Sequence, residues 1–384
     1  MATLKCKIYQ SWSLQLRWIF DKTLEAEHQP KSITKREDAM PTPPSLKTYC
    51  LCLIVGSPLG ALAQEIIDTE THRLEEVAEG IYFAVGNGAL YTMSNALIIE
   101  RDEDVVVVDT HITPAAGRAL LNSIRVVTSK PVTTLINSHF HYDHANGVPA
   151  FGPNIEIIGH EVTYQKLTGD PANEHTYLSS LTRFDNTVNR LEVELEAASS
   201  NAERRELQQQ LEFWRAHVAA QDEIVFTPPT TTLRESMTLY RGGREIQLHF
   251  FGRAHTGGDL AIFLPEEKIV FTGDMMLGGV SYMGDGYVSE WADTLQALKQ
   301  LNFDLVLPGH GPGFRDRSRI DNVQAYYTDL TEEVSRLKAL GYSADETASR
   351  ADLRQHADTL GISQLGANLE AVQRMYNLMD GRIE

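Results

Sequence analysis

The residues best suited to chemistry form one dense cluster, in which three histidines and one aspartate lie within six consecutive positions. The cluster consists of His139, His141, Asp143 and His144. Imidazole nitrogen and carboxylate oxygen suit Zn²⁺, which takes about four or five such ligands at about 2.0–2.2 Å. Four ligands can serve one ion but not two, so a two-metal site needs further ligands from elsewhere in the chain.

Three later residues meet this need, and each follows a segment that is expected to be a strand. They are His255, Asp274 and His310, each within two positions of a glycine. A single loop histidine is more often a surface residue than a ligand, and an aspartate after a strand usually caps the next turn. Together with the dense cluster, however, these residues predict a dinuclear metal site.

The first 63 residues have the features of a leader rather than of a folded domain. Residues 49–63 form a short apolar run that has a lysine before it and Ala-Leu-Ala at its end, the layout of a secretory signal cleaved before Gln64. A spanning helix needs roughly 20 apolar residues, and Pro58 interrupts this run, so cleavage is favoured over retention as an anchor. Because signals rarely start this late, Met40 is the expected natural start. The mature protein is expected to be periplasmic or secreted, without a stable membrane anchor.

Charge and cysteine content narrow the functional classes. The chain has 384 residues, with 34 Lys and Arg against 52 Asp and Glu, a formal net charge of −18. Residues 64–384 alone carry 26 basic and 47 acidic side chains, a net charge of −21. This charge repels a phosphate backbone, so no nucleic-acid partner is expected. All three cysteines lie in the leader, so the mature chain offers no thiolate ligand, disulfide or cysteine nucleophile.

Strand and helix patterns alternate after the leader. Short segments rich in β-branched and aromatic residues, separated by glycine or charged turns, predict strands. These segments are residues 80–86, 95–100, 104–109, 132–137, 155–158, 245–251, 260–264, 268–272 and 304–307. Helical spacing marks residues 113–129 and 290–301. Two groups of strands, each followed by helices, predict an α/β fold with two sheets sandwiched between helices.

Two further helical segments interrupt and extend this pattern. Between residues 177 and 221, apolar residues recur three and four positions apart on both sides of a polar break, which predicts two helices folded back as a hairpin. Packing is the plainest role for the hairpin; a lid beside the site and a homodimer contact are the alternatives. Residues 321–384 are expected to form a helical extension on the outside of the second sheet.

With these residues identified, the sequence resembles the metallo-β-lactamase superfamily of metallohydrolases over residues 75–315. The resemblance rests on Asp109 after four valines, the 139–144 cluster, and the three later residues. It implies an αββα four-layer sandwich at residues 64–320, with the hairpin as an insertion, and two bound zinc ions. It places His139, His141 and His255 on one zinc and Asp143, His144 and His310 on the other, with Asp274 bridging both and Asp109 orienting a ligand histidine.

Several branches of the superfamily fit this ligand set less well. Lactamases with a thiolate ligand carry cysteine at the position of Asp274, and those with the full histidine cluster generally lack this aspartate. Oxygen-reducing di-iron relatives usually have glutamate at the position of His141, and persulfide-oxidising relatives bind one iron with fewer ligands. RNA-cleaving branches need a positive surface. The glyoxalase II-like and lactonase-like pattern remains.

This pattern implies hydrolysis of a carboxylic ester, thioester or lactone in a small-molecule substrate. Two zinc ions would share a water whose pKa falls toward about 7, and the resulting hydroxide would attack the carbonyl carbon. Asp143 or Asp274 could accept a proton as the tetrahedral intermediate forms. A β-lactamase-type amide hydrolase is the alternative, and a non-catalytic metal-binding or interaction protein is a weaker one.

The remaining histidines give weaker signals. His111 and His160 could approach the site, but a loop or helix-start position explains each more simply, and His72 has no ligand context. Residues 275–286, which follow the expected bridging aspartate, are explained equally well as a wall of the substrate pocket and as a surface loop.

Overall fold

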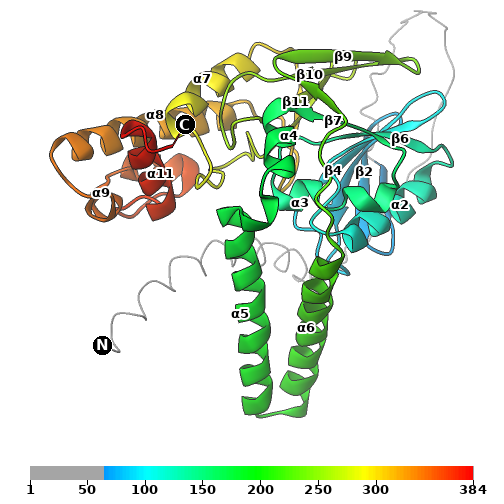
Figure 1. Cartoon of the computed structure of the whole chain (residues 1–384), viewed down its shortest axis with the longest axis horizontal. Coiled ribbons are helices and arrows are strands. Elements are labelled where there is room, and N and C mark those ends of the chain that lie inside the picture. The colour runs from blue at the N-terminus through cyan, green and yellow to red at the C-terminus, as the bar shows by residue number, and fades with distance from the viewer. Residues whose placement is uncertain (1–64, 384) are drawn as a thin grey trace, which may run out of the picture. The chain divides into compact units, whose positions relative to one another are not determined.

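The computed structural model describes residues 65–383, so the predicted leader and its signal lie outside the described part. In this part, two sheets face each other and helices cover their outer faces (Figure 1). The predicted αββα sandwich is therefore confirmed. Among residues 65–383, no helix combines the length and the apolar composition needed to cross a membrane.

The first sheet contains eight strands in the order in which they follow along the chain. The early strands pair antiparallel up to β5, and β5 to β8 pair in parallel. The strands are β1 (Glu65–Asp68), β2 (His72–Ala78), β3 (Ile81–Gly86), β4 (Ala96–Glu100), β5 (Val105–Val108), β6 (Val132–Ile136), β7 (Glu156–His160) and β8 (Thr231–Leu233). Since β5, β6 and β7 run in the same direction, their carboxyl ends open onto one edge of the sheet.

The second sheet contains five strands in the order β13-β12-β11-β10-β9. Its strands are β9 (Ser236–Arg241), β10 (Arg244–His249), β11 (Ala261–Leu264), β12 (Ile269–Gly273) and β13 (Leu305–Pro308). Only β12 and β13 pair in parallel within this sheet. Their carboxyl ends therefore also meet at one edge.

Alternating side chains on the strands supply the layers of the core. In β5, Val106 and Val108 point toward the second sheet, while Val105 and Val107 pack on the outer face. This is the period of two that a strand imposes. All four valines are fully buried because the sheet is covered on both sides, which explains why this strand is a continuous apolar run.

Helices cover both outer faces. Helix α2 (Pro114–Val127) packs Leu120 and Ile124 onto the first sheet; it begins at Pro114, and Thr113 caps its first turn by accepting from the backbone N–H of Ala116. Over the second sheet lie α7 (Val288–Leu298) and α8 (Ser318–Ala339), with the shorter α9 (Ala344–Arg350), α10 (Ala357–Leu360) and α11 (Leu369–Met379) beyond them. The predicted helical extension is thus present.

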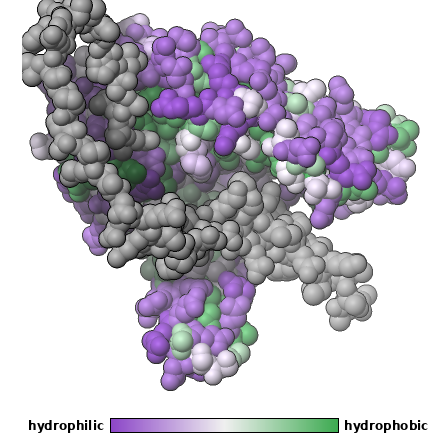
Figure 2. Space-filling view, turned by 180° about the vertical axis from the view of Figure 1, so that it is seen from behind, coloured by the Kyte–Doolittle hydropathy of each residue, from purple (hydrophilic) through white to green (hydrophobic). Residues whose placement is uncertain are grey.

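The predicted hairpin is formed by α5 (His175–Ala197) and α6 (Asn201–Ala220), which project side by side from the sandwich (Figure 1). Its base is packed: Tyr177 and Phe184 share an apolar cluster with Ile112 and Tyr142. On the face that Figure 2 shows, the far part of the hairpin is largely hydrophilic. Two short helices, α3 (Tyr142–Ala145) and α4 (Glu161–Thr168), complete the region beside its base.

Candidate metal centre

All seven residues proposed from the sequence as ligands come together at one edge of the sandwich. His139 and His141 follow β6, and Asp143 and His144 lie in α3. From the second sheet, His255 lies in the β10–β11 loop, Asp274 follows β12, and His310 follows β13. Parallel strands β5 and β6, and likewise β12 and β13, bring these segments to the same place because their carboxyl ends coincide. The potential ligand atoms form three groups, and within each group all of these atoms lie within 4.8 Å of one another. The groups are His139, His141 and His255; His139, His144 and Asp274; and Asp143, His144 and His310.

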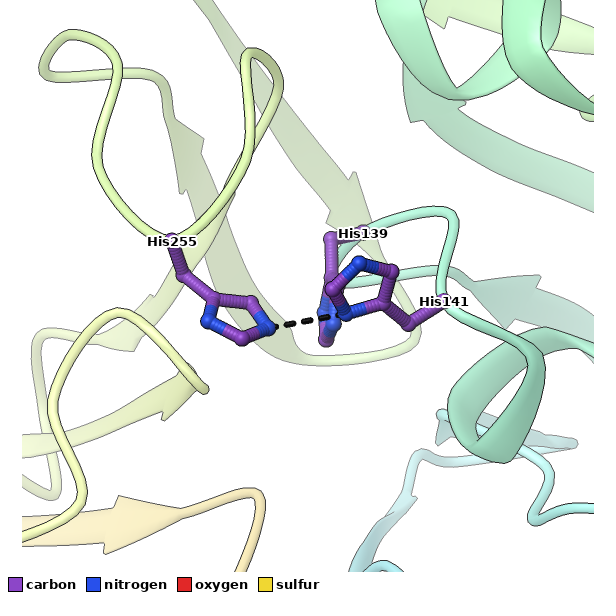
Figure 3. Close-up of side chains that lie close together, drawn as sticks. All are labelled: His139, His141 and His255. Atoms are coloured by element: carbon purple, nitrogen blue, oxygen red, sulfur yellow. Dashed lines mark hydrogen bonds between the residues drawn. The ribbon is translucent and has the colours of Figure 1, made fainter. Parts of the chain in front are cut away.

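The first group consists of three imidazoles (Figure 3). The Nδ1 atom of His141 lies 2.8 Å from Nε2 of His255. On its far side, His141 places Nε2 at 3.1 Å from a carboxylate oxygen of Asp285. His255 likewise places Nδ1 at 2.9 Å from the carbonyl oxygen of Tyr282. Each ring is thus held by one nitrogen and presents the other to its neighbour.

The hydrogen-bond partners of this first group fit a bound cation. Carbonyl and carboxylate oxygens only accept, so Nδ1 of His255 and Nε2 of His141 are the protonated nitrogens. Burial, followed by the neighbouring His141, lowers the pKa of His255 to about 4, so this ring is neutral at pH 7. The other two nitrogens, Nδ1 of His141 and Nε2 of His255, face each other at 2.8 Å. The Nε2 atom of buried His139 also has no hydrogen-bond partner, and a divalent ion would satisfy all three nitrogens.

The second group combines one carboxylate with two imidazoles. A carboxylate oxygen of Asp143 lies 3.0 Å from Nε2 of His310 and 3.3 Å from Nε2 of His144. The Nδ1–H group of His310 donates to the carbonyl oxygen of Met93, at 3.0 Å. Burial by itself would lower the pKa of His310, but Asp274 and Asp143 outweigh it and raise this pKa to about 10. The group therefore attracts positive charge strongly.

Asp274 lies between the two groups. One of its oxygens is 3.4 Å from Nε2 of His144, and the other is 3.3 Å from Nε2 of His310 and 3.5 Å from Nε2 of His255. The first oxygen is buried without a hydrogen-bond partner. Gly309 permits this approach, because a Cβ at that position would lie 2.3 Å from the same oxygen. A carboxylate in this position can reach ions in both groups.

Asp109 holds the His144 ring from behind. Its Oδ2 atom accepts from Nδ1 of His144 at 2.7 Å and from the hydroxyl of Ser138 at 2.7 Å, and its Oδ1 accepts from the backbone N–H of Ser138 at 2.8 Å. Asp109 has a φ of +62°, a conformation that is strained for a residue with a side chain. The contact leaves Nε2 of His144 facing the centre, again with no hydrogen-bond partner.

The centre is buried except on one side. Six of the seven residues are buried, whereas the His310 side chain is 28% exposed. His310 therefore marks a side on which the centre is open to solvent.

Several contacting residues are not identifiable from sequence spacing alone. Asp285 and Tyr282 hold His141 and His255, and both lie in the loop 275–286, whose role the sequence leaves open. Thr176, in the first turn of α5, donates its hydroxyl to the same oxygen of Asp285. The glycines on both sides of Asp285 were the one available signal. Within the described residues, none of the three ligand groups includes His111 or His160.

The fold and this set of imidazoles and carboxylates define an αββα protein with a candidate metal centre. Residues 91–310 match the model of the metallo-beta-lactamase superfamily, and the chain belongs to this superfamily.

Two curated relatives and one solved structure show the range of this similarity. The chain is 23% identical over 274 residues to a linear primary-alkylsulfatase of Pseudomonas sp., which covers 67% of this chain and 50% of the relative. It is 21% identical over 280 residues to a metallo-beta-lactamase type 2 of Bacteroides fragilis, covering 69% of this chain and 90% of the relative. The inverting sec-alkylsulfatase Pisa1 of Pseudomonas sp. superposes with a TM-score of 0.58 at 16% identity, covering 79% of this chain and 50% of that one. The chain thus spans about half the length of both alkylsulfatases.

Proposed function

We propose that the protein is an exported hydrolase that binds two zinc ions and cleaves a carboxylic ester, thioester or lactone. One observation carries the proposal: five imidazoles are each anchored through one nitrogen and turn the other toward the same centre, where it faces another imidazole or the carboxylates of Asp143 and Asp274. The anchors are Ser138 for His139, Asp285 for His141, Asp109 for His144, the Tyr282 carbonyl for His255 and the Met93 carbonyl for His310. Such outer contacts fix the orientation of metal-binding histidines.

The proposed division of ligands follows the groups. His139, His141 and His255 would hold one zinc ion, Asp143, His144 and His310 would hold the other, and Asp274 would contact both. When bound, the ions would supply hydroxide at neutral pH and polarise the substrate carbonyl.

The carboxylates of Asp143 and Asp274 serve mainly as ligands. Burial alone would raise the pKa of both groups, but His144 and His310 outweigh it and hold both pKa values well below the usual range. Both side chains are therefore ionised and hold cations well, whereas a carboxylate with so low a pKa is a weak proton acceptor.

A sulfate ester of an apolar alcohol is the second candidate substrate. The similarity to a linear primary-alkylsulfatase motivates it. So does the lining of a pocket beside His141, although its enclosed space is only about 20 Å³ and must open before an alkyl chain can enter. Most of the other lining is apolar or aromatic: Phe140, Tyr142, Leu167, Pro171, Tyr177 and Phe226. An alkyl or acyl chain suits such walls.

The test is a zinc analysis of the purified protein combined with a substrate panel. The panel contains chromogenic esters, lactones, thioesters, a linear alkyl sulfate and a cephalosporin. We expect two zinc ions per chain and turnover of at least one carboxylic ester, thioester or lactone. Turnover of the alkyl sulfate alone would favour the second candidate, and turnover of the cephalosporin alone would favour an amide hydrolase. Two zinc ions without any turnover would favour a binding protein.

Export is tested separately on the native host or an expression strain. We expect the protein in the periplasm or the medium, with Gln64 as its first residue by mass spectrometry. A cytoplasmic protein that keeps the residues before Gln64 would contradict this part of the proposal.

A further inference from the structure

Behind the candidate centre, two buried histidines face each other. His72, the first residue of β2, places Nε2 at 3.0 Å from Nε2 of His111, and the two rings stack with their centroids 5.1 Å apart. Both side chains are fully buried. Neither residue belongs to the proposed ligand groups, but hydrogen bonds through Ser94 connect the pair to Asp143 of the second group.

A series of hydrogen bonds connects this histidine pair, through Ser94, to the backbone of α3. This helix has a single turn, so the carbonyl groups of its last residues have no partner within it. Ser94 donates its hydroxyl to the carbonyl of Asp143 at 2.5 Å, and Thr110 donates its backbone N–H and its hydroxyl to the carbonyl of His144. These contacts hold the segment that carries two proposed ligands of the second ion.

The direction of each hydrogen bond follows from the one before it. The Ser94 hydroxyl donates its one proton to the Asp143 carbonyl. The hydroxyl oxygen of Ser94 must therefore accept from Nδ1 of His111, at 3.4 Å. A neutral His111 then has an accepting Nε2, so Nε2 of His72 is the donor. The Nδ1 atom of His72 is left as an acceptor for the hydroxyl of Thr71, at 2.9 Å.

Burial favours these neutral rings. It lowers the pKa of His72 to about 4, and together with the nearby His72 and His144 it lowers the pKa of His111 well below its usual value. His111 also has a φ of +70°, which is strained for a residue with a side chain. The surrounding contacts keep it in this conformation.

We propose that His72, His111 and Ser94 form a directed chain of hydrogen bonds that holds the Asp143 carbonyl and so positions the ligands of the second zinc ion. His72 and His111 are positioning residues in this scheme, since neither touches the ion or the substrate. The inference rests on the proposed two-zinc site, and it predicts a selective effect on one ion.

The test compares two substitutions of His72 in the full chain. His72→Leu removes the donor to His111, whereas His72→Gln keeps an amide N–H close to the position of Nε2. Zinc binding is measured by titration calorimetry, and the ligand geometry is followed by the visible spectrum of the cobalt-substituted protein. We expect His72→Leu to weaken the second ion about tenfold and to leave the first unchanged, and His72→Gln to restore the second.

The matched control is His356→Leu, because His356 is 5% exposed and bonded to Asp329 in the C-terminal helices. This variant should leave both affinities unchanged. Equal weakening of both ions in His72→Leu, no weakening, or no recovery in His72→Gln would overturn the inference. If His72→Leu does not fold, Ser94→Ala removes the last link and must show the same selective loss. A parent protein that binds fewer than two ions would instead overturn the proposed function.

Discussion

Each imidazole of the candidate centre has one nitrogen committed to a protein acceptor, and the identity of that acceptor decides which way the ring faces. For His144 and His141 the acceptor is a carboxylate, and for His255 and His310 it is a backbone carbonyl. A carboxylate also raises the basicity of the ring, which strengthens its bond to a metal. Carboxylate anchors are therefore the most informative single residues to change.

Asp109→Asn should weaken the second zinc ion about 10–100-fold, with a corresponding loss of turnover at limiting zinc. An amide offers one accepting oxygen, whereas Asp109 accepts three hydrogen bonds through two oxygens. Zinc titration of the folded variant is the measurement. Asp104→Asn is the matched control, because Asp104 precedes β5 and pairs with Arg101 away from the centre. Equal zinc affinities in both variants would contradict the role of Asp109.

Loading the second ion should release protons. Asp274 and Asp143 raise the pKa of His310 to about 10 against the effect of burial, and Asp143, Asp274 and Asp109 raise that of His144 well above its usual value. The metal-free rings therefore carry protons at neutral pH, and a metal must displace them. Zinc affinity should rise with pH up to about 10. Calorimetry in two buffers of different ionisation enthalpy should give one to two protons released per chain at pH 7; zero would contradict the prediction.

At the scale of elements, strand order explains how distant residues meet. The parallel pairs β5–β6 and β12–β13 carry Asp109, the 139–144 cluster, Asp274 and His310 to one edge. The two strand ends approach so closely there that Gly309 has no room for a Cβ, which would meet side chains of the centre and the backbone of Gly273.

Gly309→Ala should abolish binding of the second ion. Its Cβ would lie 2.3 Å from Oδ1 of Asp274 and 2.8 Å from Cε1 of His144, so a proposed ligand must move. Gly311→Ala is the control in the same loop. It has a φ of +79° but no atom within 4 Å of its Cβ, so it should cost only about 1 kcal/mol of stability. Zinc content and thermal unfolding of the two variants provide the comparison, and full zinc content in Gly309→Ala would refute the argument.

The hairpin has two parts with different expected roles. Its base contacts the centre, since Ser180 bonds the hydroxyl of Tyr142 and Thr176 bonds Asp285. Replacing residues 192–210 with a short turn keeps these contacts of the base, so zinc content and turnover should not change. Thr176→Val removes the hydrogen bond to Asp285 and should lower turnover several-fold. Substrate kinetics and light scattering are the measurements. A loss of turnover in the shortened protein would identify a lid, and a change of mass in solution would identify a homodimer contact.

Much of this arrangement could be predicted from the sequence because its signals are local. The four valines of β5, the histidine cluster and the helical periodicity of the hairpin each lie within a short window. Strands β1, β2, β8 and β9 were not predicted, because they are short or carry polar side chains on their exposed positions. Asp285, His72 and His111 act through contacts between residues far apart in the chain, which no local pattern encodes.

At the scale of the whole molecule, the folded state concentrates negative charges, which protonated His144 and His310 offset in the metal-free protein and which bound cations would offset in their place. Three buried carboxylates, those of Asp109, Asp143 and Asp274, surround imidazoles whose free nitrogens face one another. The overall formal charge of −18 adds to the attraction for cations. Folding and metal binding are therefore expected to be coupled, since the unfolded chain holds no such site.

Removing the metal should lower the thermal stability of the whole protein. An ion present at about 1,000 times its dissociation constant stabilises the native state by about 4 kcal/mol, which corresponds to a shift in Tm of roughly 10 °C for a chain of this size. Differential scanning calorimetry with and without a chelator is the measurement, and re-added zinc should restore the original Tm. Asp274→Asn should show a smaller chelator-induced shift, because an amide in place of the shared carboxylate weakens the attraction for both ions. Identical melting curves with and without the chelator would mean that the fold holds these facing nitrogens and carboxylates together without a cation.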